Sequence, residues 1–364
     1  MTEAGEGKYN EFDGVIVGSG PSAMAAALVL LRQQLSVVVI ETRTFPRHRP
    51  GESLHPGIEP LLAHLDATGV LSEANFERFD GIYSGANEPL EFTPFGQDES
   101  GVWQGYQAIG SEFDSALQRR VLALGGQLVN SKALEVLQTD GRVVGVKTLD
   151  GAKWYGRFVF DGSGGKHWLA KQLSLSINCY SPKLLVKYGY IDTSRIDDTQ
   201  LNQPLLKTHD DGWYWLAKIR HHIYSWASLN WHDGQAKATS VESDLLKQLG
   251  DCPFCDGPRF ADVTWRRVDQ SAGQGYFLLG DAAMVLDPAS SQGVMRAMLS
   301  GTMAAELALK IKSDPEQEAL IIGNYQQGMA LRFEQSRRAL ASIYRAMPQP
   351  PAWLALEHYG QYLI

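Results

Sequence analysis

Residues 12–34 read FDGVIVGSGPSAMAAALVLLRQQ, and this stretch decides the fold class. A short apolar run leads into Gly18-Ser19-Gly20, and a helix-forming stretch rich in alanine and leucine follows at once. A second apolar run, VVVI at 37–40, ends in Glu41, 23 residues after Gly18. This order of strand, glycine turn, helix and strand is the fingerprint of dinucleotide-binding domains in its GxGxxA form.

The turn between the first strand and the helix predicts how a nucleotide is held. Gly18 makes the tight turn, Gly20 lets the backbone approach a pyrophosphate, and Ala23 lets helix and strand pack closely. The phosphates are expected at the N-terminus of the 21–34 helix, because free N–H groups and the helix dipole favour anions there. The predicted nucleotide contacts are Gly18, Gly20, Pro21, Ser22 and, for the ribose, Glu41.

Two further strand ends carry an acidic residue in a glycine-rich turn, FDGSGG at 160–165 and GDAAMVLDPASSQG at 280–293. A carboxylate that follows a buried strand near a nucleotide fold can bind the ribityl hydroxyls of a flavin. The SSQG turn would start a helix whose N-terminus stabilises the negative charge of a reduced flavin. Together the two blocks favour FAD over NAD.

Four sequence blocks occur in the same order as the FAD motifs of one group of flavoproteins. They are GSGPSA, RPGES at 49–53, FDGSGG and GDAAMVLDPASSQG. Over about residues 10–312 the chain resembles aromatic-ring hydroxylases, flavin-dependent halogenases and geranylgeranyl reductases. The resemblance implies an α/β fold with a glutathione-reductase-type FAD-binding Rossmann domain and an inserted, mostly antiparallel β-sheet substrate domain. Relatives often place arginine before a segment like SEFDSAL, but here the residue is Gly110.

The same resemblance implies which residues contact the flavin. FAD would be lined by Gly18, Gly20, Ser22, Glu41, Arg43, Asp161, Gly162, Asp281, Pro288, Ser291, Gly293 and Val294. The isoalloxazine side would be approached by Arg49, Gly51, Glu52 and Ser53.

The predicted FAD-binding domain is discontinuous and comprises 10–80, 111–182 and 271–312. The predicted substrate domain comprises 81–110 and 183–270, followed by a C-terminal helical segment at 313–364. Stretches such as GWYWLAKI alternate apolar and polar residues, which is typical of an antiparallel sheet. Its tryptophans either pack in the core or bind substrate, and the candidates for substrate binding are Trp213, Trp215 and Trp226.

A halogenase would need features that this sequence lacks. Flavin halogenases carry a Trp-x-Trp-x-Ile-Pro segment, whereas residues 213–218 read WYWLAK. They also use a lysine shortly after the GES-like block, and no lysine occurs between Lys8 and Lys132. We therefore expect oxygen chemistry rather than halogenation.

The catalytic acid or base is not assigned by the sequence. His55 follows the GES block and could exchange a proton near neutral pH, although a structural histidine is an equal alternative. Glu52 and Tyr214 are weaker candidates. The motif Cys252-Pro253-Phe254-Cys255 is interpreted as a surface loop with two thiols, because it lacks the helix context of a redox site and the four ligands of a zinc site.

Composition excludes several classes of function. The chain has 364 residues, a formal net charge of -8 and three cysteines. These values argue against general nucleic-acid binding and against a disulfide framework. No apolar run reaches the roughly 20 residues of a membrane-spanning helix, so we expect a cytoplasmic protein without a transmembrane segment. No second GxGxxG unit follows, which leaves only transient binding of NAD(P)H open.

The chain resembles most the LodB/GoxB type of flavoprotein. The resemblance rests on the residues of the GDAAMVLDPASSQG block, on the GES block and on the short C-terminus. That resemblance implies an FAD-dependent monooxygenase that uses O2. Its partner would be a quinoprotein oxidase precursor, in which it modifies a tryptophan during cysteine tryptophylquinone biogenesis. Two alternatives stay open: a hydroxylase or reductase of a small aromatic or isoprenoid metabolite, and a non-catalytic FAD-binding maturation chaperone.

Overall fold

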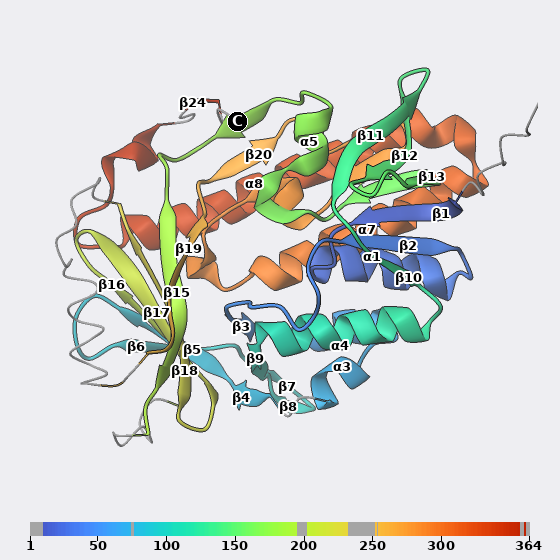
Figure 1. Ribbon diagram of the computed structural model, residues 1–364. Helices are drawn as coiled ribbons and strands as arrows, with labels where there is room; N and C mark the ends of the chain where they lie inside the picture. Colours follow the sequence, from blue (N-terminus) through green and yellow to red (C-terminus); the bar gives the residue numbers. More distant parts are fainter. Residues whose placement is uncertain are drawn as a thin grey trace, which may run out of the picture.

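The computed structural model describes residues 10–73, 76–194, 202–231, 252, 254–356 and 360–361. Figure 1 shows two large β-sheets, with helices packed against one of them and a long helix reaching from one to the other. The part of the predicted substrate domain at 232–251 lies outside the described residues.

The first large sheet has the strand order β10-β2-β1-β13-β12-β11, and β22 pairs with β13. Its strands are β1 (Asn10–Val17), β2 (Val37–Glu41), β10 (Gln127–Asn130), β11 (Ala133–Thr139), β12 (Arg142–Thr148), β13 (Lys153–Asp161) and β22 (Tyr276–Leu278), with the short β21 (Ala272–Gly273) beside β22. The strands β10, β2, β1, β13 and β22 are mutually parallel, whereas β11 and β12 form an antiparallel hairpin. The apolar ends of β1 and β2 are fully buried, as expected for parallel strands covered on both faces. The nucleotide-binding α/β fold predicted from the sequence is confirmed.

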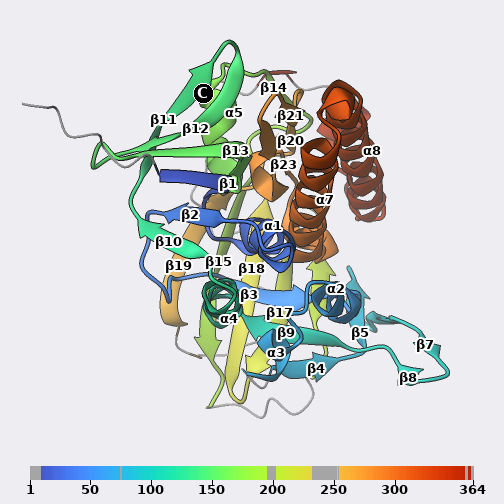
Figure 2. The same ribbon diagram turned by 90° about the vertical axis from the view of Figure 1, so that its right-hand side faces the viewer.

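Helices α1 (Pro21–Arg32) and α7 (Gly293–Ser313) pack against each other beside this sheet (Figure 2). Their contact is closest at Gly301, where an added Cβ would lie 2.0 Å from the backbone oxygen of Ser22. The helix that follows the first glycine turn therefore lies against the helix that follows the third motif. The fourth helix, α4 (Gly110–Ala123), also packs on α1.

The second large sheet has the order β19-β15-β18-β17-β16-β5-β6. Its strands are β5 (Gly81–Gly85), β6 (Glu91–Pro94), β15 (Leu185–Asp192), β16 (Leu205–Thr208), β17 (Gly212–Arg220), β18 (Ile223–Asn230) and β19 (Phe254–Asp262). All neighbours are antiparallel except β16 and β5. The mostly antiparallel sheet expected from the alternating pattern is confirmed.

Helix α8 (Glu318–Arg345) joins the two halves (Figure 1). Near its start, the Tyr325 hydroxyl donates to the backbone oxygen of Leu278 in the first sheet, at 2.8 Å. Near its end, Leu340 and Tyr344 are buried in the apolar cluster of the second sheet. One continuous helix thus contacts both sheets.

Smaller elements complete the fold. A three-stranded sheet β3-β9-β4 consists of β3 (Gly51–Leu54), β4 (Glu77–Phe79) and β9 (Gly105–Ile109). The remaining strands are β7 (Gln97–Asp98), β8 (Gly101–Val102), β14 (Ile177–Cys179), β20 (Arg266–Val268), β23 (Met284–Val285) and β24 (Gly360–Gln361). Within the described residues the remaining helices are α2 (Ile58–His64), α3 (Gly69–Ser72), α5 (Trp168–Gln172) and the short 3-10 turns η1 (Gly164–Lys166), η2 (Gly280–Ala282), η3 (Pro288–Ser290), η4 (Pro315–Gln317) and η5 (Ala352–Ala355).

Within the described ranges, no helix combines the length and the apolar character needed to cross a bilayer.

Candidate active site

The first glycine turn has the geometry that a pyrophosphate needs. Gly18 has φ +89°, and an added Cβ would lie 2.5 Å from the backbone oxygen of Gly162. A Cβ on Gly20 would meet only the Arg47 guanidinium, at 3.6 Å, so the space in front of this turn is otherwise open. No side chain caps the N-terminus of α1, and its first N–H groups are available to an anion.

Glu41, predicted to bind a ribose, also closes this turn. Its Oε2 accepts hydrogen bonds from the backbone N and the hydroxyl of Ser19, at 3.0 and 2.8 Å, and its Oε1 accepts from the backbone N of Arg43. Arg43 itself directs an exposed side chain to solvent, so only its backbone takes part. The guanidinium of Arg47 contacts Oε2 of Glu41 at 3.1 Å, which adds an arginine that the sequence motifs did not single out.

The arginine expected at position 110 has no room in this chain. A Cβ on Gly110 would lie 2.3 Å from the backbone oxygen of Pro50 and 2.9 Å from Cβ of Arg49. The space is taken by the 47–50 segment, whose Arg47 and Arg49 both pair with Asp114, each at 3.2 Å. Asp114 is almost fully buried, and the two guanidinium groups compensate its charge. These arginines bring positive charge to the site from a different segment.

The two motif aspartates differ in what they do. Asp161 is fully buried; its Oδ1 accepts from the backbone N of Ser163 at 2.9 Å, and its Oδ2 accepts from the backbone N of Leu169 at 2.8 Å. Its carboxylate therefore holds its own turn and the start of α5 rather than facing a ligand. The neighbouring Gly162 packs on Ala23, where an added Cβ would lie 2.8 Å from that methyl group.

Asp281, by contrast, is exposed within an otherwise buried stretch from Tyr276 to Val285. Water reaches the carboxylate, yet protein surrounds it closely, and this desolvation raises its pKa against the opposing effect of Arg49 and Arg296. An exposed acid that follows a buried strand is well placed to bind hydroxyl groups. Asp281 is thus the motif aspartate that remains available to a ligand.

The N-terminus of α7 faces open space beside Asp281. Gly293 has no atom within 4 Å of an added Cβ, Pro288 and Gly293 are exposed, and Val294 is half-buried. Ser291 adopts φ +52°, and its hydroxyl donates to the backbone oxygen of Ser53 at 3.0 Å. This bond places the GES block next to the start of α7. No side chain caps that helix.

The GES block and the residues after it carry two titratable side chains, Glu52 and His55, near the open space beside Asp281. Glu52 lies 3.5 Å from the Arg49 guanidinium, and desolvation raises its pKa to about 7, with Asp114 and Asp281 adding to the rise and Arg49 opposing it. His55 accepts a hydrogen bond at Nδ1 from the backbone N of Gly57, and burial lowers its pKa, so the ring is neutral at pH 7. Of the two, Glu52 has the ionisation suited to proton exchange at neutral pH.

The predicted aromatic residues divide between the two faces of the second sheet. We call the face that carries Tyr188, Ala227 and Trp215 the inner face, because Tyr190 on the same face donates its hydroxyl to the backbone oxygen of Arg49 at 2.7 Å. Ser225 and Ile219, also on the inner face, contact Gly51 of the GES block. The inner face therefore adjoins the candidate flavin site.

Two of the predicted residues point the other way. Tyr214 and Trp226 belong to a separate buried cluster on the opposite face, together with Leu216 and Tyr224. Because successive side chains on a strand alternate between faces, neither can reach the flavin side. The structure thus removes Tyr214 as a catalytic candidate and Trp226 as a substrate contact. Trp215 is on the inner face and half-buried.

Trp213 is on the inner face but fully buried, as part of a hydrogen-bond network that sequence reasoning missed. Its Nε1 donates to the Tyr344 hydroxyl at 2.9 Å, and that hydroxyl donates to Oδ2 of Asp287 at 3.0 Å. Trp265 donates to the same oxygen, and the other oxygen of Asp287 accepts from the backbone N of Ala289. The network ties α8 and the second sheet to the turn that precedes α7.

The residues at the Asp281 opening fit FAD. Two uncapped helix N-termini, an open Gly293 and an exposed acid offer sites for phosphate, flavin carbonyl and ribityl groups. Nη1 of Arg296 is buried without a hydrogen-bond partner in the described part of the chain. A buried guanidinium nitrogen without a hydrogen-bond partner, close to an exposed acid, is the arrangement expected of a site whose ligand completes it.

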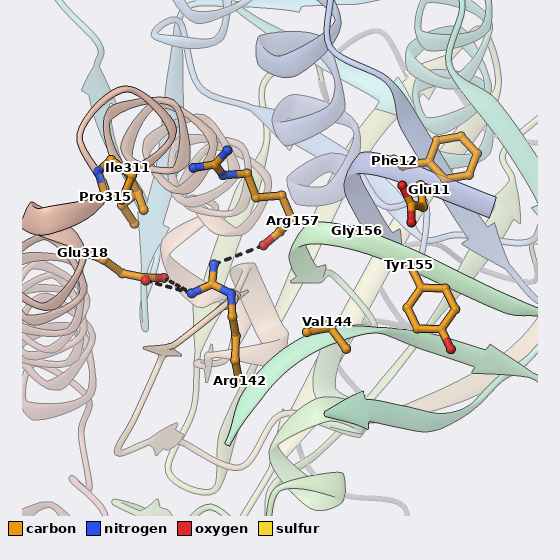
Figure 3. Close-up of a pocket in the computed structure, with 10 residues that line it drawn as sticks. All are labelled: Glu11, Phe12, Arg142, Val144, Tyr155, Gly156, Arg157, Ile311, Pro315 and Glu318. Atoms are coloured by element: carbon orange, nitrogen blue, oxygen red, sulfur yellow. Dashed lines mark hydrogen bonds and ion pairs between the residues drawn. The ribbon is translucent and has the colours of Figure 1, made fainter. Parts of the chain in front are cut away.

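A cavity of about 830 Å³ lies elsewhere (Figure 3). It is lined by Glu11 and Phe12 at the start of β1 and by Arg142, whose guanidinium pairs with Glu318 at 2.7 Å. Ligands of parallel α/β sheets bind at the carboxyl ends of the strands, whereas this cavity adjoins the amino end of β1. It is separate from the candidate site.

The two cysteines of the Cys252-Pro253-Phe254-Cys255 motif differ in exposure. Cys252 is buried, Cys255 is exposed and neither is in a disulfide, while Pro253 between them lies outside the described residues. Within the described ranges no group of His, Cys, Asp or Glu side chains is arranged to hold a metal ion.

Comparison with known proteins identifies relatives of the same architecture. The chain is 25% identical over 366 residues to a tryptophan 2-halogenase of Chondromyces crocatus. The alignment covers 91% of this chain and 67% of that protein. The chain is 25% identical over 320 residues to a 1H-pyrrole-2-carbonyl-[peptidyl-carrier protein] brominase of Pseudoalteromonas luteoviolacea, covering 82% and 77%. It is also 26% identical over 324 residues to a menaquinone reductase of Mycobacterium tuberculosis, covering 81% and 76%.

Among solved structures, the flavin-dependent halogenase CmlS superposes with a TM-score of 0.82 at 22% identity, covering 94% of this chain and 67% of that one. The family model "tryptophan halogenase" matches residues 13–80 and 89–358. The chain therefore belongs to the halogenase family although it lacks the lysine and the Ile-Pro segment. Our expectation from the sequence, that these two differences set the chain apart from halogenases, is wrong at the level of the family. The protein is a member of the tryptophan halogenase family of FAD-dependent enzymes.

Proposed function

We propose that the protein uses reduced FAD and O2 to modify an electron-rich aromatic ring, and that halogenation is the reaction to test first. One observation carries the proposal: the Arg49 guanidinium interacts electrostatically with the exposed acid Asp281 and with Tyr188 of the inner face, and the Tyr190 hydroxyl donates to the Arg49 backbone oxygen, so the candidate cofactor site adjoins an aromatic surface. The halogenases among the relatives support the choice of reaction.

Bound FAD would supply the reaction of reduced flavin with O2. The chain's own contribution is to bind, to orient and to move protons. Asp281 and the N-termini of α1 and α7 would hold the cofactor, while the ion pair of the partly exposed Arg49 with the buried Asp114 keeps the 47–50 segment in place. Glu52, with a pKa of about 7, can hold or release a proton beside this opening at neutral pH.

A second candidate reaction, oxygenation of the ring, has a specific observation in its favour. Lys187, Lys207 and Lys218 alternate with inner-face residues on their strands, so they lie on the opposite face of the sheet. The sequence has no lysine between Lys8 and Lys132, in the region where halogenases carry theirs. A chain without that amine would transfer oxygen to the ring instead.

The narrower form of this candidate is modification of a tryptophan in a quinoprotein oxidase precursor, during cysteine tryptophylquinone biogenesis. It remains a prediction of the sequence resemblance, and co-purification with such a precursor tests it. Reduction of a small isoprenoid metabolite, the other alternative, has the menaquinone reductase among the relatives in its favour.

One experiment separates the reactions. The FAD-loaded protein is reduced without oxygen, mixed with indole or a tryptophan-containing peptide, and then exposed to O2 with and without bromide. Mass spectrometry that detects a brominated product supports halogenation, whereas a product heavier by one oxygen atom, independent of bromide, supports oxygenation. Flavin that reoxidises to release only hydrogen peroxide in every condition would contradict both. The Asp281→Ala variant, depleted of FAD, is the control.

A further inference from the structure

The position of the Asp281 carboxylate depends on the backbone that carries it. Within the described residues this side chain accepts no hydrogen bond and forms no ion pair, although three arginines act on it electrostatically. An acid without a bonded partner stays in one place only if its own turn is held. The turn η2, which contains Asp281, therefore decides where the carboxylate meets a ligand.

Side chains from two other segments hold η2 on either side of Asp281. Before it, the backbone N of Gly280 donates to the Ser300 hydroxyl of α7 at 2.8 Å, and that hydroxyl donates to the backbone oxygen of Ala297. After it, the backbone oxygen of Ala282 lies 2.9 Å from Nδ1 of His167. Both neighbours of Asp281 in the chain are thus anchored by hydrogen bonds.

The partner on the other side of the His167 ring fixes its tautomer. Nε of Arg266 lies 2.8 Å from Nε2 of His167, and an arginine nitrogen can only donate. Nε2 is therefore the acceptor, and the single proton of the neutral ring is on Nδ1, from which it is donated to Ala282. Burial lowers the pKa of His167 to about 4, so the ring is neutral at pH 7.

Arg266 is itself immobilised, with only 1% of its surface exposed. Its Nη1 donates to the backbone oxygen of Thr264 at 3.0 Å and pairs with Asp262 at 3.2 Å. Its Nη2 donates to the backbone oxygen of Gly165 at 3.0 Å. Because the guanidinium is bonded to three segments, the His167 ring that it contacts has one fixed position.

The backbone of His167 is equally constrained. The residue adopts φ +51° between η1 and α5, where its N donates to the oxygen of Gly164 and its oxygen accepts from the N of Lys171, each at 3.0 Å. It lies two residues after the FDGSGG block, whose Asp161 holds the same stretch through Ser163 and Leu169. The second motif therefore presents a fixed imidazole to the turn of the third motif.

We infer that His167 is a positioning residue for the cofactor, because its Nδ1–H bond to Ala282 holds η2 and thereby sets the place in which Asp281 binds FAD. The second motif thus acts on the cofactor through His167, and Asp161 serves to hold the segment that carries it. This inference rests on the part of the proposed function that assigns Asp281 to FAD, and it is independent of the reaction that the flavin performs.

Two substitutions separate the two bonds of the ring. In His167→Asn the amide nitrogen takes the place of Nδ1 and can still donate to Ala282, and asparagine accepts a left-handed backbone. In His167→Gln the longer amide can accept from Arg266, but the donor toward Ala282 is lost. FAD affinity of the FAD-free chains is measured by titration with FAD and flavin fluorescence. We expect the Gln variant to bind FAD about 2- to 12-fold more weakly, the effect of one hydrogen bond, and the Asn variant to bind it like wild type.

A double-mutant cycle shows whether the effect passes through Asp281. In the Asp281→Ala background, His167→Gln should cause no further loss of FAD affinity, since the carboxylate that it positions is gone. His221→Gln, the same substitution at an exposed position, is the matched control and should leave FAD affinity unchanged. Ser300→Ala releases the other side of η2 and gives the same test if the histidine variants do not fold: it should weaken FAD binding only when Asp281 is present.

Four results would overturn the inference. They are equal FAD affinities of His167→Gln and wild type, equal losses in the Asn and Gln variants as expected of a merely structural histidine, a Gln effect that persists undiminished without Asp281, and an Asp281→Ala chain that binds FAD normally. The proposed reaction can fail separately, because these affinities are measured without turnover. A protein with the expected affinities that forms neither halogenated nor oxygenated product would keep the role of His167 and contradict the proposed reaction alone.

Discussion

Nη2 of Arg49 lies 3.5 Å from Oε1 of Glu52, and both groups lie beside the open carboxylate of Asp281. Two opposing effects set the pKa of Glu52. The arginine favours the charged carboxylate, but desolvation, together with the negative charges of Asp114 and Asp281, has the larger effect. A glutamate with a pKa of about 7 next to the flavin site follows from this balance.

The first prediction concerns stability against pH. The folded chain keeps a proton on Glu52 that the unfolded chain releases above its ordinary pKa of 4.5, so the free energy of unfolding falls as pH rises from 4.5 to about 7. The fall from this one residue is at most about 3 kcal/mol. Urea unfolding of FAD-free wild type and Glu52→Gln between pH 4.5 and 8 measures it. Because the amide does not titrate, the variant should lack this fall; parallel curves would contradict the raised pKa.

A second prediction separates the two motif aspartates. Asp281→Ala should lower FAD affinity by about 10- to 100-fold, since a hydrogen bond to a charged group contributes about 1.5–3 kcal/mol, and should leave the stability of the FAD-free chain nearly unchanged. Asp161→Ala removes the acceptor of the buried backbone N–H of Leu169 and of the part-buried N–H of Ser163, and should lower the free energy of unfolding by about 2 kcal/mol or more. Flavin absorbance and thermal unfolding give the two readouts. Equal losses of stability in both variants would refute the distinction.

The third prediction is that Gly110 admits no side chain. In Gly110→Ala the new methyl group meets Pro50 and Arg49, which must shift, and the free energy of unfolding should fall by about 1–3 kcal/mol. Gly323→Ala is the control, because Gly323 lies in α8 with nothing within 4 Å, and it should stabilise the chain by about 0.4–1 kcal/mol. Differential scanning calorimetry compares them, and a stabilised Gly110→Ala protein would show that the segment has room.

The fourth prediction concerns the network that joins α8 to the α7 turn. Tyr344→Phe removes the hydroxyl between Trp213 and Asp287 and leaves the buried indole N–H without its acceptor, at a cost of about 1–3 kcal/mol in the free energy of unfolding. Tyr83→Phe, at an exposed position, should change it by less than about 0.5 kcal/mol. Chemical unfolding monitored by tryptophan fluorescence measures both. Identical midpoints would mean that the network adds no stability.

Sequence patterns were sufficient to predict those turns, strands and helices that depend on interactions between neighbouring residues. The turn at Gly18, the buried strands on either side of α1 and the alternating strands of the second sheet were all predicted, because backbone conformation and burial follow from neighbouring residues. The same patterns could not assign the faces of the second sheet. Tyr214 and Trp215 are adjacent, yet only Trp215 lies on the inner face, and that choice depends on where the GES block packs.

The sequence by itself determined the nucleotide-binding fold, the order of the FAD motifs and the second sheet, since each depends on spacing within a short stretch. Only the tertiary structure decided that Asp161 holds its own turn while Asp281 stays exposed, and that Arg47 and Asp114 join the site. These properties arise from contacts between distant segments, such as the bond between Ser53 and Ser291, which are 238 residues apart. Burial and charge compensation at such contacts are set by packing, and no local pattern encodes them.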